Sequence, residues 1–312
     1  MPFLDIFLVI LPVFLVIGSG ALASRFGPFT HDFVEGLTLF AQSIAIPCLL
    51  FRTMAQIDLA QSFDTGLVVS FYLAAAVCFL LGIVSGRFVF GSDPGRSVAL
   101  GFSSMYTNAL LLGLPITAVA FGPAATANNF AIIAFQAPIC YLIGVTAMEI
   151  ANSGERGLLQ TAATTVLRIL RQPHIFSLIA GLAVNLLGLP LPGFVSGPLD
   201  MLGDAALPVA LFGLGGILTR YSLRGSWKET ALVLAIALLV NPALTLLFGY
   251  WFHLSQAALN SAVITAAMAP GVNTYMFANI YRTARDVTAS AMVAGTAISV
   301  LTVPVWVLIL TR

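Results

Sequence analysis

Two short stretches carry the residues that could do chemistry in an otherwise apolar chain. The first reads SSMYTNALLLGLPI at residues 103–116, and the second reads APGVNTYMFANIY at residues 269–281. Each places asparagine and threonine beside glycine and proline, which interrupt a helix and expose backbone N–H and C=O groups. Asn108 and Asn273 are therefore the leading candidates for ligand binding.

The chemistry that these stretches offer is the binding of an anion. The N-terminal end of the helix segment after each interruption presents up to four unpaired N–H groups and about half a positive charge. An asparagine amide adds two donors, so a carboxylate can bind there without a lysine. Tyr106, Thr107 and Thr274 are the polar neighbours in the two stretches. The alternative is that all these residues only kink and pack the helices.

The composition places these stretches in a lipid bilayer. Of the 312 residues, 59% are hydrophobic and 8% are charged, whereas a soluble globular chain carries roughly 25% charged residues. Apolar runs of about 20 residues, the length that a membrane helix needs, recur along the whole chain. No soluble domain fits between them.

We predict ten membrane spans from these runs. They lie at residues 4–24, 34–54, 66–90, 97–121, 127–149, 174–189, 199–219, 230–252, 257–280 and 288–310. The first run resembles a secretory signal, but it carries Asp5 and has no Lys or Arg before it. We therefore predict that it is a span.

The basic residues predict the orientation of the ten spans. When loops are counted alternately, all 13 Lys and Arg residues except Arg52 and Arg312 fall on one side. The positive-inside rule puts that side in the cytoplasm and both termini outside, as in a multi-pass protein of the cell membrane. The formal net charge of +1 gives no reason to expect a nucleic acid as a partner.

An internal repeat divides the chain into two halves. AIPCLLF at residues 45–51 and ALPVALF at residues 206–212 share the pattern Ala-x-Pro-x-x-Leu-Phe and fall in the second and seventh spans. Five spans per half is an odd number, so the halves must have opposite orientations, as in many secondary transporters. We predict a first repeat at 1–150, a cytoplasmic linker at 151–173 and a second repeat at 174–312. The fold class is then an all-α membrane protein with two inverted five-helix repeats.

The interruptions occupy corresponding places in the two repeats, in the fourth and ninth spans. Irregular backbone at membrane depth is tolerated only where it is buried in protein or lines a wet cavity. Paired interruptions in the two halves are therefore the best sequence indication of a transporter binding site.

Four stretches together resemble the auxin efflux carrier family, which includes plant auxin carriers and bacterial relatives linked to malonate and other organic acids. They are TNALLLGLPI at 107–116, RQPHIFSLIAGLAVNLLGLPLP at 171–192, ALPVALFGLGG at 206–216 and APGVNTYMFANIY at 269–281. The resemblance implies ten helices in two inverted repeats. It further implies that the first two helices of each repeat form a scaffold and the others a moving transport domain. Substrate would bind where the broken fourth and ninth helices cross.

The resemblance also implies site residues. The family's Pro-Asn in the fourth helix falls on Thr107 and Asn108, and its Gly-x-x-Pro in the ninth falls on Gly271 to Thr274. This chain therefore has threonine where plant members have proline. Gln136 lies in a helix of the implied transport domain. The chain lacks the long central loop of many plant carriers, which favours a compact prokaryotic relative and disfavours auxin as substrate.

We thus expect a secondary active or facilitative carrier of a small organic anion that works by alternating access. The alternative is a cation-coupled symporter or a sodium/proton antiporter of related fold, with Asp204 as the candidate coupling residue. Asp200 and Asp204 could instead stabilise a helix N-terminus. The three histidines lack metal-ligand spacing, so we expect no enzyme, metal or cofactor. The implied scaffold is also a candidate surface for a homodimer.

Overall fold

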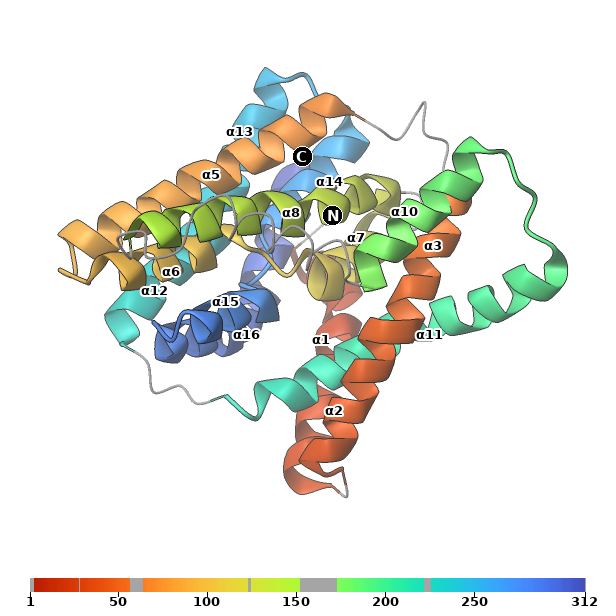
Figure 1. Ribbon diagram of the computed structural model, residues 1–312, viewed down its shortest axis with the longest axis horizontal. Coiled ribbons are helices and arrows are strands. Elements are labelled where there is room, and N and C mark those ends of the chain that lie inside the picture. Colours follow the sequence, from red (N-terminus) through yellow and green to blue (C-terminus); the bar gives the residue numbers. More distant parts are fainter. Residues whose placement is uncertain are drawn as a thin grey trace. The chain divides into compact units, whose positions relative to one another are not determined.

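The structure is a computed structural model, and it describes residues 3–27, 29–56, 64–122, 125–151, 173–221 and 226–311. All regular elements in these ranges are helices, so the predicted all-α class is confirmed for them (Figure 1). The expected linker at 151–173 lies outside the described residues except at its two ends. By its internal contacts the chain divides into two compact units.

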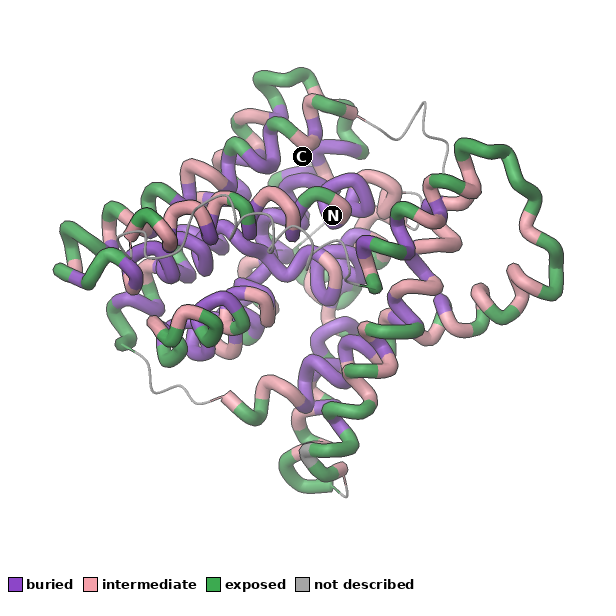
Figure 2. Tube along the Cα trace, viewed as in Figure 1, coloured by how far each residue is buried: buried purple, intermediate pink, exposed green. Residues whose placement is uncertain are grey.

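Unit 1 consists of residues 1–11, 64–166 and 221–312. Its helices are α5 (Thr65–Phe88), α6 (Pro94–Met105), η2 (Ala109–Gly113), α7 (Leu114–Phe121), α8 (Thr126–Ala151), α12 (Trp227–Ala235), η4 (Ile236–Val240), α13 (Asn241–Trp251), α14 (Gln256–Ala266), α15 (Val272–Ile280) and α16 (Arg285–Leu310). Almost every residue of α6 is buried, which places this helix at the centre of the unit (Figure 2).

Unit 2 consists of residues 12–63 and 167–220. It contains most of α1 (Phe3–Phe26), which begins in unit 1, together with α2 (His31–Phe40), η1 (Ala41–Ala45), α3 (Ile46–Gln56), α10 (Pro173–Leu186) and α11 (Gly193–Leu218). Glycines bring α1 and α11 into backbone contact. A Cβ atom on Gly215 would lie 1.8 Å from the carbonyl oxygen of Ile17, and one on Gly20 would lie 2.0 Å from that of Phe212. Any larger residue would separate these helices.

Seven helices in the described ranges are long and apolar enough to cross a membrane. They are α1, α5, α8, α11, α16 and the continuous segments Asp32–Gln56 and Trp227–Trp251. The other three predicted spans coincide with α10, with α6 followed by Ala109–Phe121, and with α14 followed by α15. Each of these is short or interrupted, so the total of ten spans stays a prediction.

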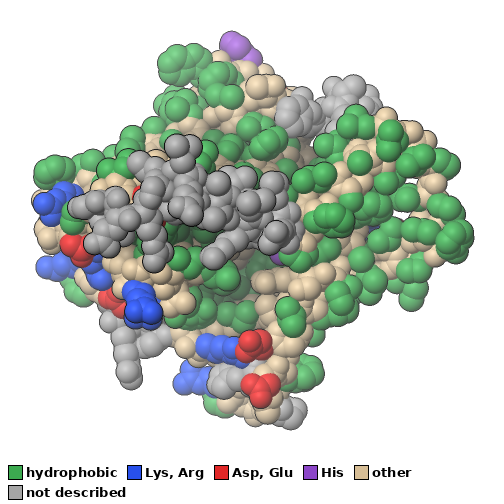
Figure 3. Space-filling view, viewed as in Figure 1, with side chains coloured by type: hydrophobic (Ala, Val, Ile, Leu, Met, Phe, Trp, Pro, Cys, Tyr) green, Lys and Arg blue, Asp and Glu red, His purple; other side chains and the backbone are tan. Residues whose placement is uncertain are grey.

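The surface of α5 is suited to lipid. Val69, Leu73, Leu80 and Val84 are all exposed, and their spacing puts them on one side of the helix. An exposed apolar stripe of this kind has a cost in water but none in hydrocarbon. Hydrophobic side chains predominate on the face in Figure 3.

A charged cluster ties together the starts of three helices in unit 1. Arg96 of α6 donates to Glu229 of α12, with Nη2 2.6 Å from Oε2, and to Asp286 of α16, with Nη2 3.3 Å from Oδ2. The hydroxyl of Ser92 donates to Glu229 Oε1 at 3.0 Å. Glu229 is buried, so its charge depends on these donors.

Replacement of Arg96 by alanine should therefore destabilise the protein. Loss of one partner of a fully buried ion pair costs about 3–5 kcal/mol, and we expect about 2 kcal/mol here because the Arg96 side chain is partly exposed. Thermal unfolding in detergent measures the effect. Arg96→Ala with Glu229→Gln should recover part of the loss, because the buried charge is then gone.

The exposed Arg282 provides a matched control. Arg282→Ala should unfold close to the wild-type temperature. Equal stability of Arg96→Ala and wild type would show that the cluster does not hold the three helices together.

Candidate functional site

The first predicted interruption falls between α6 and η2. Helix α6 ends at Met105, and Tyr106 is extended, with φ −90° and ψ 99°. A new helical segment begins at Ala109 and runs to Phe121. Asn108 caps it, because its side-chain Oδ1 accepts from the N–H of Leu111 at 3.3 Å.

The second predicted interruption falls between α14 and α15. Helix α14 ends at Ala266, and α15 begins at Val272. Pro270 has no N–H and therefore cannot continue the helix. Gly271 is the extended N-cap of α15, with φ −81° and ψ 170°. A methyl group on Gly271 would make ordinary contact with Asn108, 3.4 Å from its Cα, so neither space nor dihedral angles demand glycine.

The two interruptions pair with each other inside unit 1. The N–H of Asn108 donates to the carbonyl of Ala269 at 2.9 Å, and the N–H of Gly271 donates to that of Tyr106 at 3.3 Å. Thr107 and Pro270 form an isolated antiparallel bridge. The backbone groups that have no helical partner at each interruption are thus paired in part by backbone groups of the other interruption.

Among the described residues, some donors on the two helix starts have no partner. The N–H groups of Ala109 and Leu110 precede the first bonds of their helical segment and have no partner within it, and the same holds for Val272 and Asn273. The side-chain N–H₂ of Asn108 forms no hydrogen bond with the described residues. These donors are backbone dipoles and an amide, so the positive potential needs no basic side chain.

Aromatic side chains surround Asn273. Its Nδ2 donates to the phenol oxygen of Tyr106 at 2.8 Å, and the hydroxyl of Tyr141 lies 3.5 Å from its Oδ1. Beside them the rings of Phe102 and Phe277 stack at 4.0 Å between centroids. One N–H of Asn273 is therefore held by Tyr106.

Gln136 and Thr274 support the interruptions. Gln136 Nε2 donates to the carbonyl oxygen of Thr107 at 2.8 Å and to its Oγ1 at 3.2 Å. The hydroxyl of Thr274 donates to the carbonyl of Gly271 at 2.8 Å. Gln136, Thr107 and Thr274 are all buried. Their polar atoms thus engage the backbone at the two interruptions, and a direct contact of these residues with substrate stays a prediction.

Asp204 lies in unit 2, whereas the other predicted site residues belong to unit 1. Arg52 Nη1 lies 2.9 Å from Asp204 Oδ1 and 3.2 Å from Asp200 Oδ1. The side chain of Asp204 is 72% exposed. Asp204 is therefore paired with an arginine of its own unit.

Several residues of this region escaped the sequence analysis. Tyr141 lies in an apolar helix, and no local pattern marks it. Asn129 of α8 is fully buried, and its Nδ2 donates to Thr265 at 2.7 Å and to Thr117 at 3.2 Å. The polarity of Asn129 in an apolar span was a usable signal, since such groups seek partners on other helices.

The comparisons with known proteins agree with one another. The sequence model of a family described as "Membrane transport protein" matches residues 5–307. An uncharacterized transporter of Methanothermobacter thermautotrophicus is 23% identical and covers 96% of this chain and 97% of its own length. A putative malonate transporter of Rhizobium meliloti is also 23% identical, over 94% and 92% respectively. Auxin efflux carrier component 8 of Arabidopsis thaliana is 21% identical, over 94% of both chains.

Gln136→Leu should destabilise the first interruption. The substitution leaves the buried carbonyl of Thr107 without its donor, and an orphaned buried group costs about 1–3 kcal/mol. Thermal unfolding in detergent should show the loss. Gln42→Leu is the control, because Gln42 is only half-buried in η1. If both variants unfold alike, the bond from Gln136 to Thr107 does not contribute to stability.

Proposed function

Because the chain belongs to the family of membrane transport proteins that includes the auxin efflux carriers, we propose that it carries a small organic anion across the membrane by alternating access. The substrate is a carboxylate, and it binds at the crossing of the two interrupted helices. Transport is either secondary active or facilitative.

The crossing is the observation that carries this proposal. Two helix starts, at Ala109 and Val272, belong to segments held together by the bond from Asn108 N–H to Ala269 and by that from Gly271 N–H to Tyr106. The N–H groups on these helix starts and the side-chain N–H₂ of Asn108 have no partner among the described residues, and together they form a set of donors that suits a carboxylate. The two stretches at 103–116 and 269–281 contain no Lys or Arg. Dipoles alone would then supply the attraction.

The substrate class is supported by a relative and by the residues around the donors. One protein similar to this chain is named a putative malonate transporter. The rings of Tyr106, Tyr141, Phe102 and Phe277 lie beside Asn273 and its amide. Apolar walls lower the local dielectric constant and so strengthen the few hydrogen bonds that a carboxylate would make.

The division into units supports a moving transport domain. Unit 2 contains the first, second, sixth and seventh predicted spans, except the first residues of α1, and unit 1 contains the other six. This is the grouping that a scaffold and a transport domain require. We propose accordingly ten spans in two inverted repeats, at 1–150 and 174–312, with both termini outside. The scaffold is the proposed surface for a homodimer.

Asn108→Ala and Asn273→Ala should each weaken transport of a short carboxylate. A hydrogen bond to a charged group is worth about 1.5–3 kcal/mol, so the apparent KM should rise roughly 10-fold to 100-fold. The measurement is uptake of labelled malonate and other short carboxylates into liposomes that contain the pure protein. Asn260→Ala is the control, since Asn260 bonds to Gln256 near the start of α14. Unchanged uptake in both asparagine variants would show that the substrate does not bind at the two interruptions.

Coupling to a cation through Asp204 is the alternative proposal. The ion pair with Arg52 favours a structural role for this carboxylate. We therefore expect Asp204→Asn to leave the dependence of uptake on imposed proton and sodium gradients unchanged. Uptake is compared in liposomes with and without each gradient. Loss of a gradient dependence that the wild type possesses would favour the coupled mechanism instead.

A further inference from the structure

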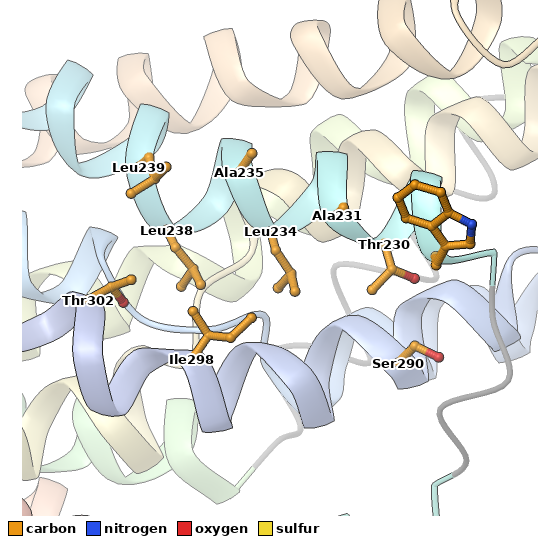
Figure 4. A pocket seen from close by; sticks show the side chains of 10 residues that line it. Thr230, Ala231, Leu234, Ala235, Leu238, Leu239, Ser290, Ile298 and Thr302 are labelled. Carbon is orange, nitrogen blue, oxygen red and sulfur yellow. The ribbon is translucent and has the colours of Figure 1, made fainter.

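Helices α12 and α16 leave an open groove between them in unit 1. Its volume is about 440 Å³, and its walls are mostly apolar. The residues that line it are Trp227, Thr230, Ala231, Leu234, Ala235, Leu238, Leu239, Ser290, Ile298 and Thr302. Figure 4 shows Ala231, Ala235 and the leucines along one wall and Ile298 on the facing helix. The groove has no part in the proposed substrate site.

The length of the groove matches one leaflet of a bilayer. From Trp227 to Leu239 the wall rises by about 18 Å at 1.5 Å per residue. Half of the hydrocarbon core of a bilayer is about 15 Å thick. Ala231 and Ala235 are small and exposed, which leaves the groove open to the side along this length. An extended hydrocarbon chain has this length and this polarity.

One end of the groove carries a positive charge and hydrogen-bond donors. Trp227 is 74% exposed, and the ammonium of Lys228 lies 5.7 Å from the centre of its ring. Lys228 is exposed and forms no ion pair with the described residues. The nearby carboxylates of Glu229 and Asp286 are both engaged by Arg96.

The same end contains an unsatisfied buried group. Thr230 lines the groove, and its hydroxyl oxygen is buried and has no hydrogen-bond partner among the described residues. A buried hydroxyl without a partner has an energetic cost that a bound polar group would remove. The sequence predicts that this end faces the cytoplasmic leaflet, where anionic lipids attract lysine.

We propose that this groove binds an anionic phospholipid of the cytoplasmic leaflet. One acyl chain lies along Leu234, Leu238 and Ile298, and the phosphate group lies beside Lys228 and Trp227. The tryptophan ring suits the boundary between hydrocarbon and head groups. An extended peptide would need hydrogen bonds for its backbone along the groove, and the walls offer few.

The bound acyl chain would pack against Leu234, which lies close to the residues of the second interruption. Leu234 lines the groove, and a methyl group on Gly295 of α16 would lie 2.8 Å from its Cδ2. The same methyl group would lie 3.2 Å from Cδ of Pro270. One layer of residues therefore separates the groove from Pro270. The lipid would stabilise the packing of α12 and α16 on which the position of Pro270 depends.

Native mass spectrometry of the purified full chain tests the proposal directly. The probes are palmitoyl-oleoyl phosphatidylglycerol and the zwitterionic phosphatidylcholine with the same acyl chains, each titrated into detergent-solubilised protein. The wild type should bind one phosphatidylglycerol at least about fivefold more tightly than it binds phosphatidylcholine. One lysine near the head group contributes about that factor in affinity. Lys228→Gln should bind the two lipids equally. Ala235→Phe fills the groove and should bind both at least about tenfold more weakly.

Two control variants separate this site from general lipid contact. Leu80→Phe enlarges an exposed residue of α5, and Arg282→Gln removes an exposed charge. Both should bind phosphatidylglycerol as the wild type does, and thermal unfolding should confirm that all variants are folded. Equal binding of the two lipids by the wild type, or undiminished binding by Ala235→Phe, would overturn the proposal. Displacement of the phospholipid by an equimolar free fatty acid would also overturn it, because the occupant would then be a fatty acid. Since no transport is measured, these outcomes are independent of the substrate site.

Discussion

The structure depends on the pairing of backbone groups where two helices are interrupted in an apolar protein. An unpaired N–H or C=O group costs several kcal/mol in hydrocarbon, so an isolated break would be unstable. Here the breaks pair with each other, through Asn108 N–H to Ala269 and Gly271 N–H to Tyr106. Gln136 supplies a further donor for the carbonyl of Thr107. Each interruption is stable because the other lies against it.

This pairing also explains how the proposed anion site could form without a basic side chain. The bonds that join the two breaks use the groups that precede Ala109 and Val272. The first N–H groups of the two new helix segments then have no partner within the part of the chain that the structure describes. The side-chain oxygen of Asn108 caps the new helix segment, and its side-chain N–H₂ forms no hydrogen bond with the described residues. A lysine at this depth would attract an anion more strongly, but would be costly to bury when the site is empty. A carrier must release its substrate as well as bind it. Dipoles attract the anion more weakly than a lysine would, and weaker binding allows release.

The rest of unit 1 holds this arrangement in place by contacts between its helices. Arg96 joins the starts of α6, α12 and α16, and close approach at glycine brings α5 against α6, where a Cβ on Gly82 would lie 2.6 Å from Cα of Gly101. Gly295 allows α16 to approach Pro270 from the groove side. An ion-pair cluster and close approach at small residues therefore both act on the position of the two interruptions.

The sequence by itself determined the helices and the places where they stop. Hydropathy and the local effects of Pro270, Gly271 and Asn108 depend only on neighbouring residues, so the predicted spans and both interruptions fall where helices and irregular backbone occur. It also identified the family through short stretches spread over the chain. The tertiary structure alone decided which polar groups meet. Arg52 engages Asp204, Gln136 supports Thr107, and Tyr106 holds Asn273. These pairs are 29 to 167 residues apart, and no local pattern encodes them, because a polar atom in an apolar interior takes whichever partner the packing of helices brings within about 3 Å.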